Sequence, residues 1–424
     1  MSQSSYPPGP TEWRRTLLEI QKDPLQFLIQ LQKDYGNFVH YRHGPTAHVY
    51  FVNTPELIRE VLVTQSYRMQ RTNTVQRSLG RFLGNGLLVS SGDYHHQQRQ
   101  LMQPLFASAS VAQFDHLMVA SARQLVSHWH DGETRDLVPD MQELTMDILY
   151  QTIFSTEAGN LGPSVRSAIA ILQRYSGEMI QRTPQMSEDE CNLAIQKFND
   201  AFDELVMHSH TNNWLSLLLN SEMSRAQARD EVITLIVAGQ ETSANGLAWM
   251  WYLLAQNPEI QERIYAEVKH ILDGVHPTAV HLEQMPLVLN TVRESLRIYP
   301  PAWLIGRSPT ESVALDGYSI YPEDTIIVSP YVLHHTAEYH PEPDRFNPDR
   351  FTDEPLRYTY LPFGAGPHVC LGQPFAVLEL ALILAAVIVD WRFDLADDRH
   401  VEWKPLVTLQ SAQGVHLVLH RRKD

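Results

Sequence analysis

The residues best suited to chemistry lie in a short glycine-rich loop that surrounds one cysteine. The loop is FGAGPHVCLG, residues 363–372, and it contains Cys370. Glycines allow such a backbone to turn tightly and to approach a flat cofactor closely. A helix is expected directly after the loop, from about Gln373 to Asp390, and a helix N-terminus favours negative charge. Cys370 is therefore expected to be a thiolate, which on a haem iron would promote O–O cleavage.

A second group of polar residues interrupts an otherwise apolar helix. The segment from Ser224 to Gln256 is expected to be one helix, roughly 50 Å long at 1.5 Å per residue. Its apolar run Val232–Ala238 is followed by GQETS, residues 239–243, and apolar residues resume at Leu247. A buried polar patch needs hydrogen-bond partners, which argues against a helix that merely turns a polar face outward.

An acid and an arginine also stand one helical turn apart, at Glu294 and Arg297. Such pairs are common on solvated helices, so the spacing alone says little. Here, however, two prolines end the helix at once, and NPDRF follows at residues 347–351.

Taken together, these motifs resemble those of the cytochrome P-450 superfamily. The haem-binding signature of that family is Phe-x-x-Gly-x-x-x-Cys-x-Gly, which Phe363, Gly366, Cys370 and Gly372 match. The family usually has Arg two residues before the cysteine, where this chain has His368. The resemblance implies haem b (iron protoporphyrin IX) as the cofactor, Cys370 as its metal ligand, Phe363 as a haem contact and His368 as a residue that faces a haem propionate.

The resemblance also gives the other two motifs a role. GQETS is similar to the family's Ala/Gly-Gly-x-Asp/Glu-Thr element, which implies that Thr242 donates a hydrogen bond to the oxygen being activated and that Glu241 relays protons from solvent. Glu294 and Arg297 are similar to the Glu-x-x-Arg element, and Arg350 to the arginine of the Pro-Glu-Arg-Phe element. The last three would form a buried charged triad that locks the cysteine loop.

Three further residues are candidates for holding the haem. His95 and Arg99 have the spacing of the family's Trp-x-x-x-Arg element, with His95 in place of the tryptophan. Arg99 is expected to bind a haem propionate, because a guanidinium pairs with a carboxylate through two hydrogen bonds. Arg307, just beyond the two prolines, is a second candidate for the same role.

The composition narrows the possible function classes. The chain has 424 residues, of which 43% are hydrophobic, and a formal net charge of −16, which argues against nucleic acid and anionic membranes as partners. Its two cysteines are far apart in sequence and fit a reducing compartment, and Cys191 is expected to be buried and inert. We see no signal peptide and no run of ~18 apolar residues, so we expect a cytoplasmic protein with no membrane span.

The elements that must position these residues are mostly helices. Helical patterns cover most of the chain from Pro55 to Val275, with loops near 84–92 and 160–163, and again from Val288 to Tyr299. Strand patterns occur at Phe38–Tyr41, His48–Val52 and Val313–Val328. We therefore expect one domain, residues 1–424, that is mainly α with small β-sheets, as the resemblance to cytochrome P-450 also implies.

The leading hypothesis is a monooxygenase that inserts one oxygen atom of dioxygen into a lipophilic substrate such as a fatty acid, terpenoid or carotenoid. The residues expected over the haem are apolar: Phe82, Leu83, Leu87–Val89, Ala302–Ile305, Leu406 and Val407. No flavin or iron–sulfur motif is visible, so electrons are expected from a ferredoxin or flavodoxin with its reductase. Two alternatives stay open. One is a peroxide-dependent or rearranging relative, which often lacks the acid–alcohol pair. The other is a non-enzymatic haem-based gas sensor, which an output domain or interaction tail would support.

Overall fold

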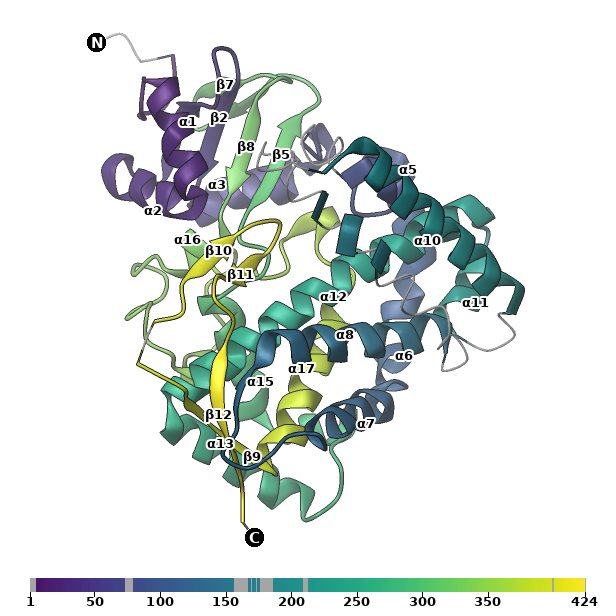
Figure 1. The fold of residues 1–424 in the computed structure, drawn as a ribbon. Coiled ribbons are helices and arrows are strands. Elements are labelled where there is room, and N and C mark those ends of the chain that lie inside the picture. Colours follow the sequence, from purple (N-terminus) through teal and green to yellow (C-terminus); the bar gives the residue numbers. More distant parts are fainter. Residues whose placement is uncertain are drawn as a thin grey trace.

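The fold is that of a computed structural model, which describes residues 5–72, 79–155, 186–208, 213–398 and 400–423, and also 167, 168, 170–172, 174 and 175. Over these residues the chain is mainly helical and includes four small sheets (Figure 1). The mainly α fold class expected from the sequence is confirmed. The predicted loop near 160–163 lies outside the described residues.

The helices follow one another along the chain in three groups. The first group is α1 (Trp13–Lys22), α2 (Pro24–Tyr35), α3 (Pro55–Arg59), α5 (Gly92–Met102), α6 (Ser108–Ala112) and α7 (Asp115–Val126). The second is α8 (Leu137–Phe154), α10 (Glu188–His208), α11 (Trp214–Leu219), α12 (Arg225–Gln256) and α13 (Pro258–Leu272). The third is α14 (Ala279–Leu282), α15 (Pro286–Ile298), α16 (Pro330–His334) and α17 (Gln373–Ile388).

The largest sheet has the strand order β1-β2-β8-β5-β3. Its strands are β1 (Phe38–Arg42), β2 (His48–Val52), β3 (Met69–Gln70), β5 (Ile305–Pro309) and β8 (Thr325–Val328). In the antiparallel pair β3–β5, Gln70 lies opposite Ser308. This register brings Arg71, which follows β3, close to Arg307 in β5, although the two arginines are far apart in sequence.

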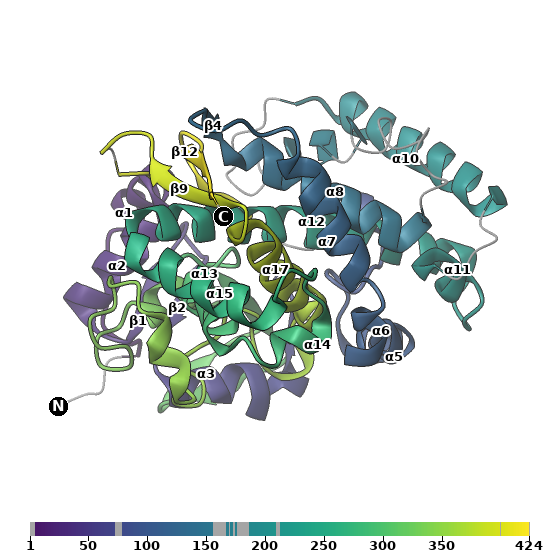
Figure 2. The same cartoon turned by 90° about the horizontal axis from the view of Figure 1, so that it is seen from below.

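Helix α12 lies at the centre of the helical part (Figures 1 and 2). A capping box starts it: the Ser224 side chain accepts the Gln227 amide proton, and the Gln227 side chain accepts the Ser224 amide proton. Every residue from Ser243 to Ala255 is buried, because α8, α15 and α17 pack around this half of the helix. The sequence therefore has no one-sided apolar stripe here.

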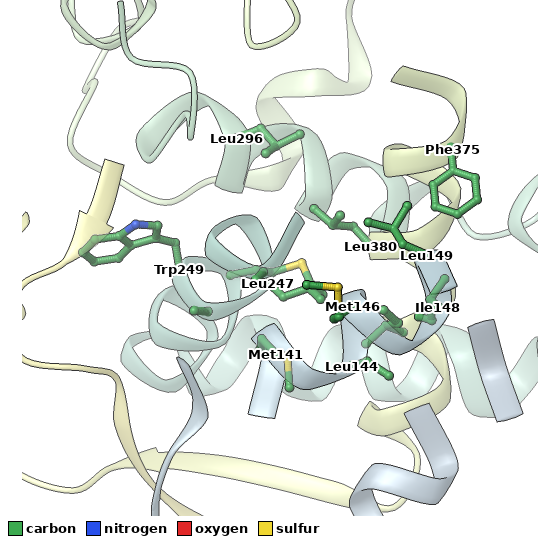
Figure 3. Packing of buried hydrophobic residues seen from close by; sticks show 14 of the residues in the cluster. Met141, Leu144, Met146, Ile148, Leu149, Leu247, Trp249, Leu296, Phe375 and Leu380 are labelled. Carbon is green, nitrogen blue, oxygen red and sulfur yellow. The ribbon is translucent and has the colours of Figure 1, made fainter. Parts of the chain in front are cut away.

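Figure 3 shows how these helices share one apolar core. The labelled side chains come from α8 (Met141, Leu144, Met146, Ile148, Leu149), α12 (Leu247, Trp249), α15 (Leu296) and α17 (Phe375, Leu380). Burying one such side chain stabilises the fold by about 1.5–3 kcal/mol. The same core thus fixes α12, which carries the polar motif, and α17, which directly follows the cysteine loop.

The remaining strands form three smaller sheets. They are β4-β12-β9, the hairpin β6-β7 and the hairpin β10-β11, built from β4 (Thr134–Asp136), β6 (Val313–Leu315), β7 (Tyr318–Ile320), β9 (Trp391–Leu395), β10 (Trp403–Pro405), β11 (Leu409–Ser411) and β12 (His416–Arg421). Asp316 and Gly317 both have positive φ, 47° and 82°, as a tight two-residue hairpin turn requires. That turn divides the predicted strand region 313–328 into shorter strands.

The expected helices around both motifs are confirmed with small shifts at their ends. The helix after the cysteine ends at Ile388, two residues earlier than predicted, and the long helix begins at Arg225 with Ser224 as its cap. Across the described part of the chain, no helix combines the length and the apolar character that crossing a membrane demands.

Candidate active site

The loop that carries Cys370 is closed by its own backbone. The Cys370 amide donates to the Phe363 carbonyl oxygen over 2.9 Å. Gly364 and Gly366 have φ values of +73° and +72°, which L side chains rarely adopt. A Cβ atom on Gly366 would lie 1.8 Å from the Leu62 carbonyl oxygen, so this position of the loop admits only glycine.

The Cys370 thiol lies deep in the fold, although the residue as a whole keeps accessible surface. Burial raises the pKa of this thiol. The Gly372 amide, the Arg99 guanidinium, the Gln373 amide and the Arg71 guanidinium lower it. The two amides belong to the start of α17, where the helix dipole also favours an anion. Bonding of the sulfur to a metal cation would favour the thiolate further.

Five basic side chains converge at this loop: Arg71 after β3, His95 and Arg99 on α5, Arg307 in β5, and His368 in the loop itself. Burial lowers the pKa of Arg307 to about 9 and that of Arg71 to about 10, and it lowers the pKa of Arg99 as well. Repulsion between the arginines adds to the shifts at Arg307 and Arg71.

None of these arginines pairs with a carboxylate of a described residue. Arg99 Nη1 donates to the Val369 carbonyl oxygen over 2.8 Å, and Arg307 Nη1 donates to the Gly306 carbonyl oxygen over 2.8 Å. The buried Nε of Arg71 has no hydrogen-bond partner among the described residues. The cluster is therefore a concentration of positive charge for which the described part of the chain supplies no carboxylate.

These residues fit a haem. An unpaired buried charge is strongly destabilising, so the cluster calls for an anionic partner. The propionates of a haem are carboxylates, which arginines bind through paired hydrogen bonds, and a Cys370 thiolate would add negative charge at the same place. Cys370 would hold the iron, and Arg71, Arg99 and Arg307 would hold the propionates.

His95 and His368 lie within the cluster and touch each other, with ring centroids 4.1 Å apart. Burial, followed by the charge of Arg71, lowers the pKa of His95 to about 4 and that of His368 to about 2. Both rings are thus neutral in this environment. No described residue forms a hydrogen bond with the buried Nδ1 of His368, so this nitrogen is available to a propionate.

Glu241 and Thr242, which are adjacent on α12, form hydrogen bonds with different parts of the protein. The Thr242 hydroxyl donates to the Ala238 carbonyl oxygen, one turn earlier, over 2.7 Å. Glu241 instead turns to the β10–β11 hairpin, where Gln410 Nε2 donates to its Oε1 over 2.6 Å and the Thr408 hydroxyl donates to the same oxygen. The two motif residues are adjacent in sequence, but the acid is held by a different element.

The charged triad expected from the sequence forms at the end of α15. Arg297 donates to both carboxylate oxygens of Glu294, over 2.7 and 2.9 Å, and both side chains are fully buried. Arg350 Nε donates to Glu294 over 3.4 Å. Arg297 also donates to the His334 carbonyl oxygen over 2.9 Å, and His334 Nε2 accepts the Leu361 amide proton over 2.8 Å. Leu361 lies just before the cysteine loop, so the triad is linked to that loop.

The structure thus brings most of the predicted haem residues together. The haem site proposed at the cysteine loop contains Cys370, His368, His95, Arg99 and Arg307. The backbone of Phe363 closes the loop beside them. Their roles toward a haem stay predictions. Cys191 is fully buried, and burial raises the pKa of its thiol, as expected of an inert cysteine.

Three residues of the site were missed by the sequence analysis: Arg71, Thr408 and Gln410. Arg71 reaches the cluster only through the pairing of β3 with β5, and the other two reach Glu241 only through the β10–β11 hairpin. No local spacing marks either relationship. The sequence analysis had assigned the region around Arg71 to helices, so the short strand β3 that positions this arginine was missed as well.

Comparisons with known proteins agree with this geometry. The model of the cytochrome P-450 family matches residues 6–417. A cyclooctat-9-en-7-ol 5-monooxygenase of Streptomyces melanosporofaciens is 31% identical over 411 residues, which cover 91% of this chain and 88% of the relative. The cyclooctatin synthase of the same organism is 30% identical over 95% of each chain. A pentalenene oxygenase of Streptomyces avermitilis is 29% identical over 95% of this chain and 94% of its own.

Proposed function

The chain belongs to the cytochrome P-450 family, and we propose from this that its substrate is a cyclic terpenoid and that its haem is b-type. It is a haem-thiolate monooxygenase, which uses dioxygen, a lipophilic substrate and electrons from redox partners. The observation that supports the proposed site best is that Cys370, which keeps accessible surface, lies near three arginines that lack a carboxylate partner among the described residues.

Each side chain of the site has a separate task in this proposal. Cys370 binds the iron as a thiolate, which the amides at the start of α17 and the nearby arginines stabilise. Arg71, Arg99 and Arg307 orient the haem by its propionates. When bound, the haem supplies the activation of dioxygen and the oxidation of the substrate. Thr242 donates a hydrogen bond to the oxygen being activated, and Glu241 takes protons up from solvent and passes them inward.

The names of the relatives support the choice of substrate class. One relative is named as a 5-monooxygenase of cyclooctat-9-en-7-ol, an unsaturated alcohol, and another as an oxygenase of pentalenene, an alkene. The sequence already favours a lipophilic substrate, because the segments expected over the haem are apolar. Among fatty acids, terpenoids and carotenoids, these names favour terpenoids.

The proposed electron donor is a ferredoxin or a flavodoxin with its reductase. The chain has only two cysteines, too few for the four that usually hold an iron–sulfur cluster.

The family model already spans residues 6–417, and we propose that all 424 residues form one domain that works in the cytoplasm.

The first experiment tests the cofactor and the substrate class together. The reduced, carbon-monoxide-bound protein should absorb at the wavelength typical of thiolate-ligated haem, Cys370→Ser should lose that band, and Cys191→Ser should keep it. Pentalenene and cyclooctat-9-en-7-ol should then displace the water ligand and shift the spectrum, whereas palmitic acid should have little effect. A stronger shift with palmitic acid would contradict the terpenoid assignment.

The second experiment tests the reaction. With a surrogate ferredoxin, its reductase and the terpene that shifts the spectrum, the enzyme should form a product that carries one oxygen atom. Thr242→Ala should keep haem and substrate binding but convert most of the consumed reductant into hydrogen peroxide. If Thr242→Ala forms product with an unchanged yield per electron, Thr242 does not have the proposed role. An equal rate of product formation from hydrogen peroxide alone would favour the peroxide-dependent alternative.

A further inference from the structure

One face of α12 is bonded over successive turns to the β10–β11 hairpin. Glu241, Asn245 and Trp249 are spaced four residues apart and therefore share this face. Asn245 Nδ2 donates to the Thr408 hydroxyl oxygen over 3.0 Å, and Trp249 Nε1 donates to the Leu409 carbonyl oxygen over 3.0 Å. The two bonds that Glu241 accepts complete this contact.

The contacts of Glu241 are confined to one of its oxygens. The Thr408 hydroxyl and Gln410 Nε2 both donate to Oε1, and no donor among the described residues reaches Oε2. Because Asn245 donates to the Thr408 oxygen, the hydroxyl proton of Thr408 is left to point at Glu241. The direction of each bond in this network is therefore fixed.

Two further hydrogen bonds attach the hairpin independently of Glu241. The Trp249 indole already bonds to Leu409, and the Leu409 amide donates to the Pro301 carbonyl oxygen over 3.0 Å. Thr408 is only 5% exposed, and its buried hydroxyl is satisfied by the two hydrogen bonds with Asn245 and Glu241. Buried polar groups of this kind are stable only when each has a partner.

We propose that Thr408 and Gln410 are positioning residues for proton delivery by Glu241. They hold Oε1 against the hairpin and leave Oε2 as the oxygen that exchanges protons. In each transfer one proton enters at Oε2 from solvent and one leaves it toward Thr242, so Glu241 returns to the carboxylate. This inference rests on the proposed monooxygenase function and adds two residues to its machinery.

The test variants remove one donor each. Gln410→Met and Thr408→Val keep the size of the side chain but lose its bond to Glu241. Gln413→Met is the matched control, because Gln413 lies just beyond β11 and its Nε2 also donates to a glutamate, Glu402, over 3.0 Å. All variants are used as haem-bound enzyme, with the carbon-monoxide spectrum as the check that the site is intact.

The readout is the rate of dioxygen consumption without added substrate, driven by reduced nicotinamide through a surrogate ferredoxin and its reductase. Gln410→Met and Thr408→Val should each lower this rate about fivefold, the factor that corresponds to one lost hydrogen bond. The rate ratio between H2O and D2O should rise, because proton transfer then limits turnover. Gln413→Met should change neither value, and Thr408→Ser should restore both.

A double-mutant comparison separates positioning from a structural effect. In a Glu241→Gln background, Gln410→Met should have no further effect on the rate or on the isotope ratio, because the residue acts through Glu241. If Gln410→Met matches Gln413→Met in an otherwise unmodified enzyme that consumes dioxygen, this inference alone is overturned. If the unmodified enzyme consumes no dioxygen with reduced partners, either without substrate or with the terpene that shifts its spectrum, the proposed function is overturned together with it.

Discussion

The imidazole rings of His95 and His368 are in contact, with centroids 4.1 Å apart. These are the two positions where the chain departs from the haem-binding motifs of its family, which usually have Trp and Arg there. The two residues that differ from the family motifs are therefore neighbours in the fold. The positive charge that an arginine would bring at position 368 comes instead from neighbouring arginines: after burial, Arg71 and Arg307 are the main groups that lower the pKa of His368.

The histidine pair should act as a unit in haem retention. His95→Leu and His368→Leu should each raise the rate of haem transfer to apomyoglobin about fivefold, since each removes one hydrogen-bonding ring from the propionate side. The double variant should lose haem more slowly than the product of the two effects predicts, because the rings support each other. Unchanged transfer rates in both single variants would show that the pair does not hold the haem.

Arg71 should contribute more than either histidine. Arg71→Met removes a buried charge that has no carboxylate partner among the described residues, and a charge-assisted bond to a propionate is worth about 1.5–3 kcal/mol. Haem loss should therefore accelerate more than tenfold. Arg68→Met is the control, because Arg68 pairs with Glu311 at the surface over 2.8 Å. Equal haem loss in the two variants would exclude Arg71 from the haem site.

The sequence was sufficient where the relevant contacts are local. The cysteine loop needs glycines at fixed positions and a helix directly after it, and Glu294 and Arg297 are one turn apart on one helix. The long helix was also predictable, because its cap and its apolar run are contiguous. Such features leave a spacing that can be recognised in one sequence.

The sequence was insufficient where strand pairing sets the contact. Arg71 meets Arg307 because Gln70 lies opposite Ser308, and a shift of that register by one residue would turn Arg71 to the other side of the strand. Gln410 reaches Glu241 because the β10–β11 hairpin returns to α12 after most of the C-terminal third of the chain. The strands involved are too short for their pairing to be predicted from alternation.

The charged triad should be essential for stability. Arg297→Met leaves the buried Glu294 carboxylate without its two short bonds, and breaking a buried pair of this kind typically costs about 3–5 kcal/mol. The change should appear as a lower denaturant midpoint of the haem-bound enzyme, or as a failure to accumulate folded protein. Arg15→Met, which breaks an exposed pair with Glu19, should leave the midpoint within error. Similar midpoints for both variants would contradict a structural role of the triad.

Glu379 should make the stability of the protein depend on pH. It lies on α17, is 1% exposed, and its Oε1 has no hydrogen-bond partner within the described ranges of the chain. Burial raises its pKa from 4.5 to about 8, and the bond that the Ser243 hydroxyl donates offsets this only in part. Between these two pH values the folded protein keeps a proton that the unfolded chain has lost. The free energy of unfolding should therefore fall as pH rises from about 4.5 to about 8, by an amount on the order of 5 kcal/mol.

Glu379→Gln tests this because the amide stays neutral at every pH. At about pH 5 both proteins have an uncharged group at this position, so their thermal midpoints should be similar. At about pH 8.5 the unmodified protein must ionise a buried acid, and the variant should have the higher midpoint. Glu231, whose pKa burial raises to about 7, titrates in both proteins and cancels in the difference. Exposed Glu19→Gln should show no such divergence between the two pH values. If the midpoint difference between Glu379→Gln and the unmodified protein is the same at both, Glu379 is not the titrating group.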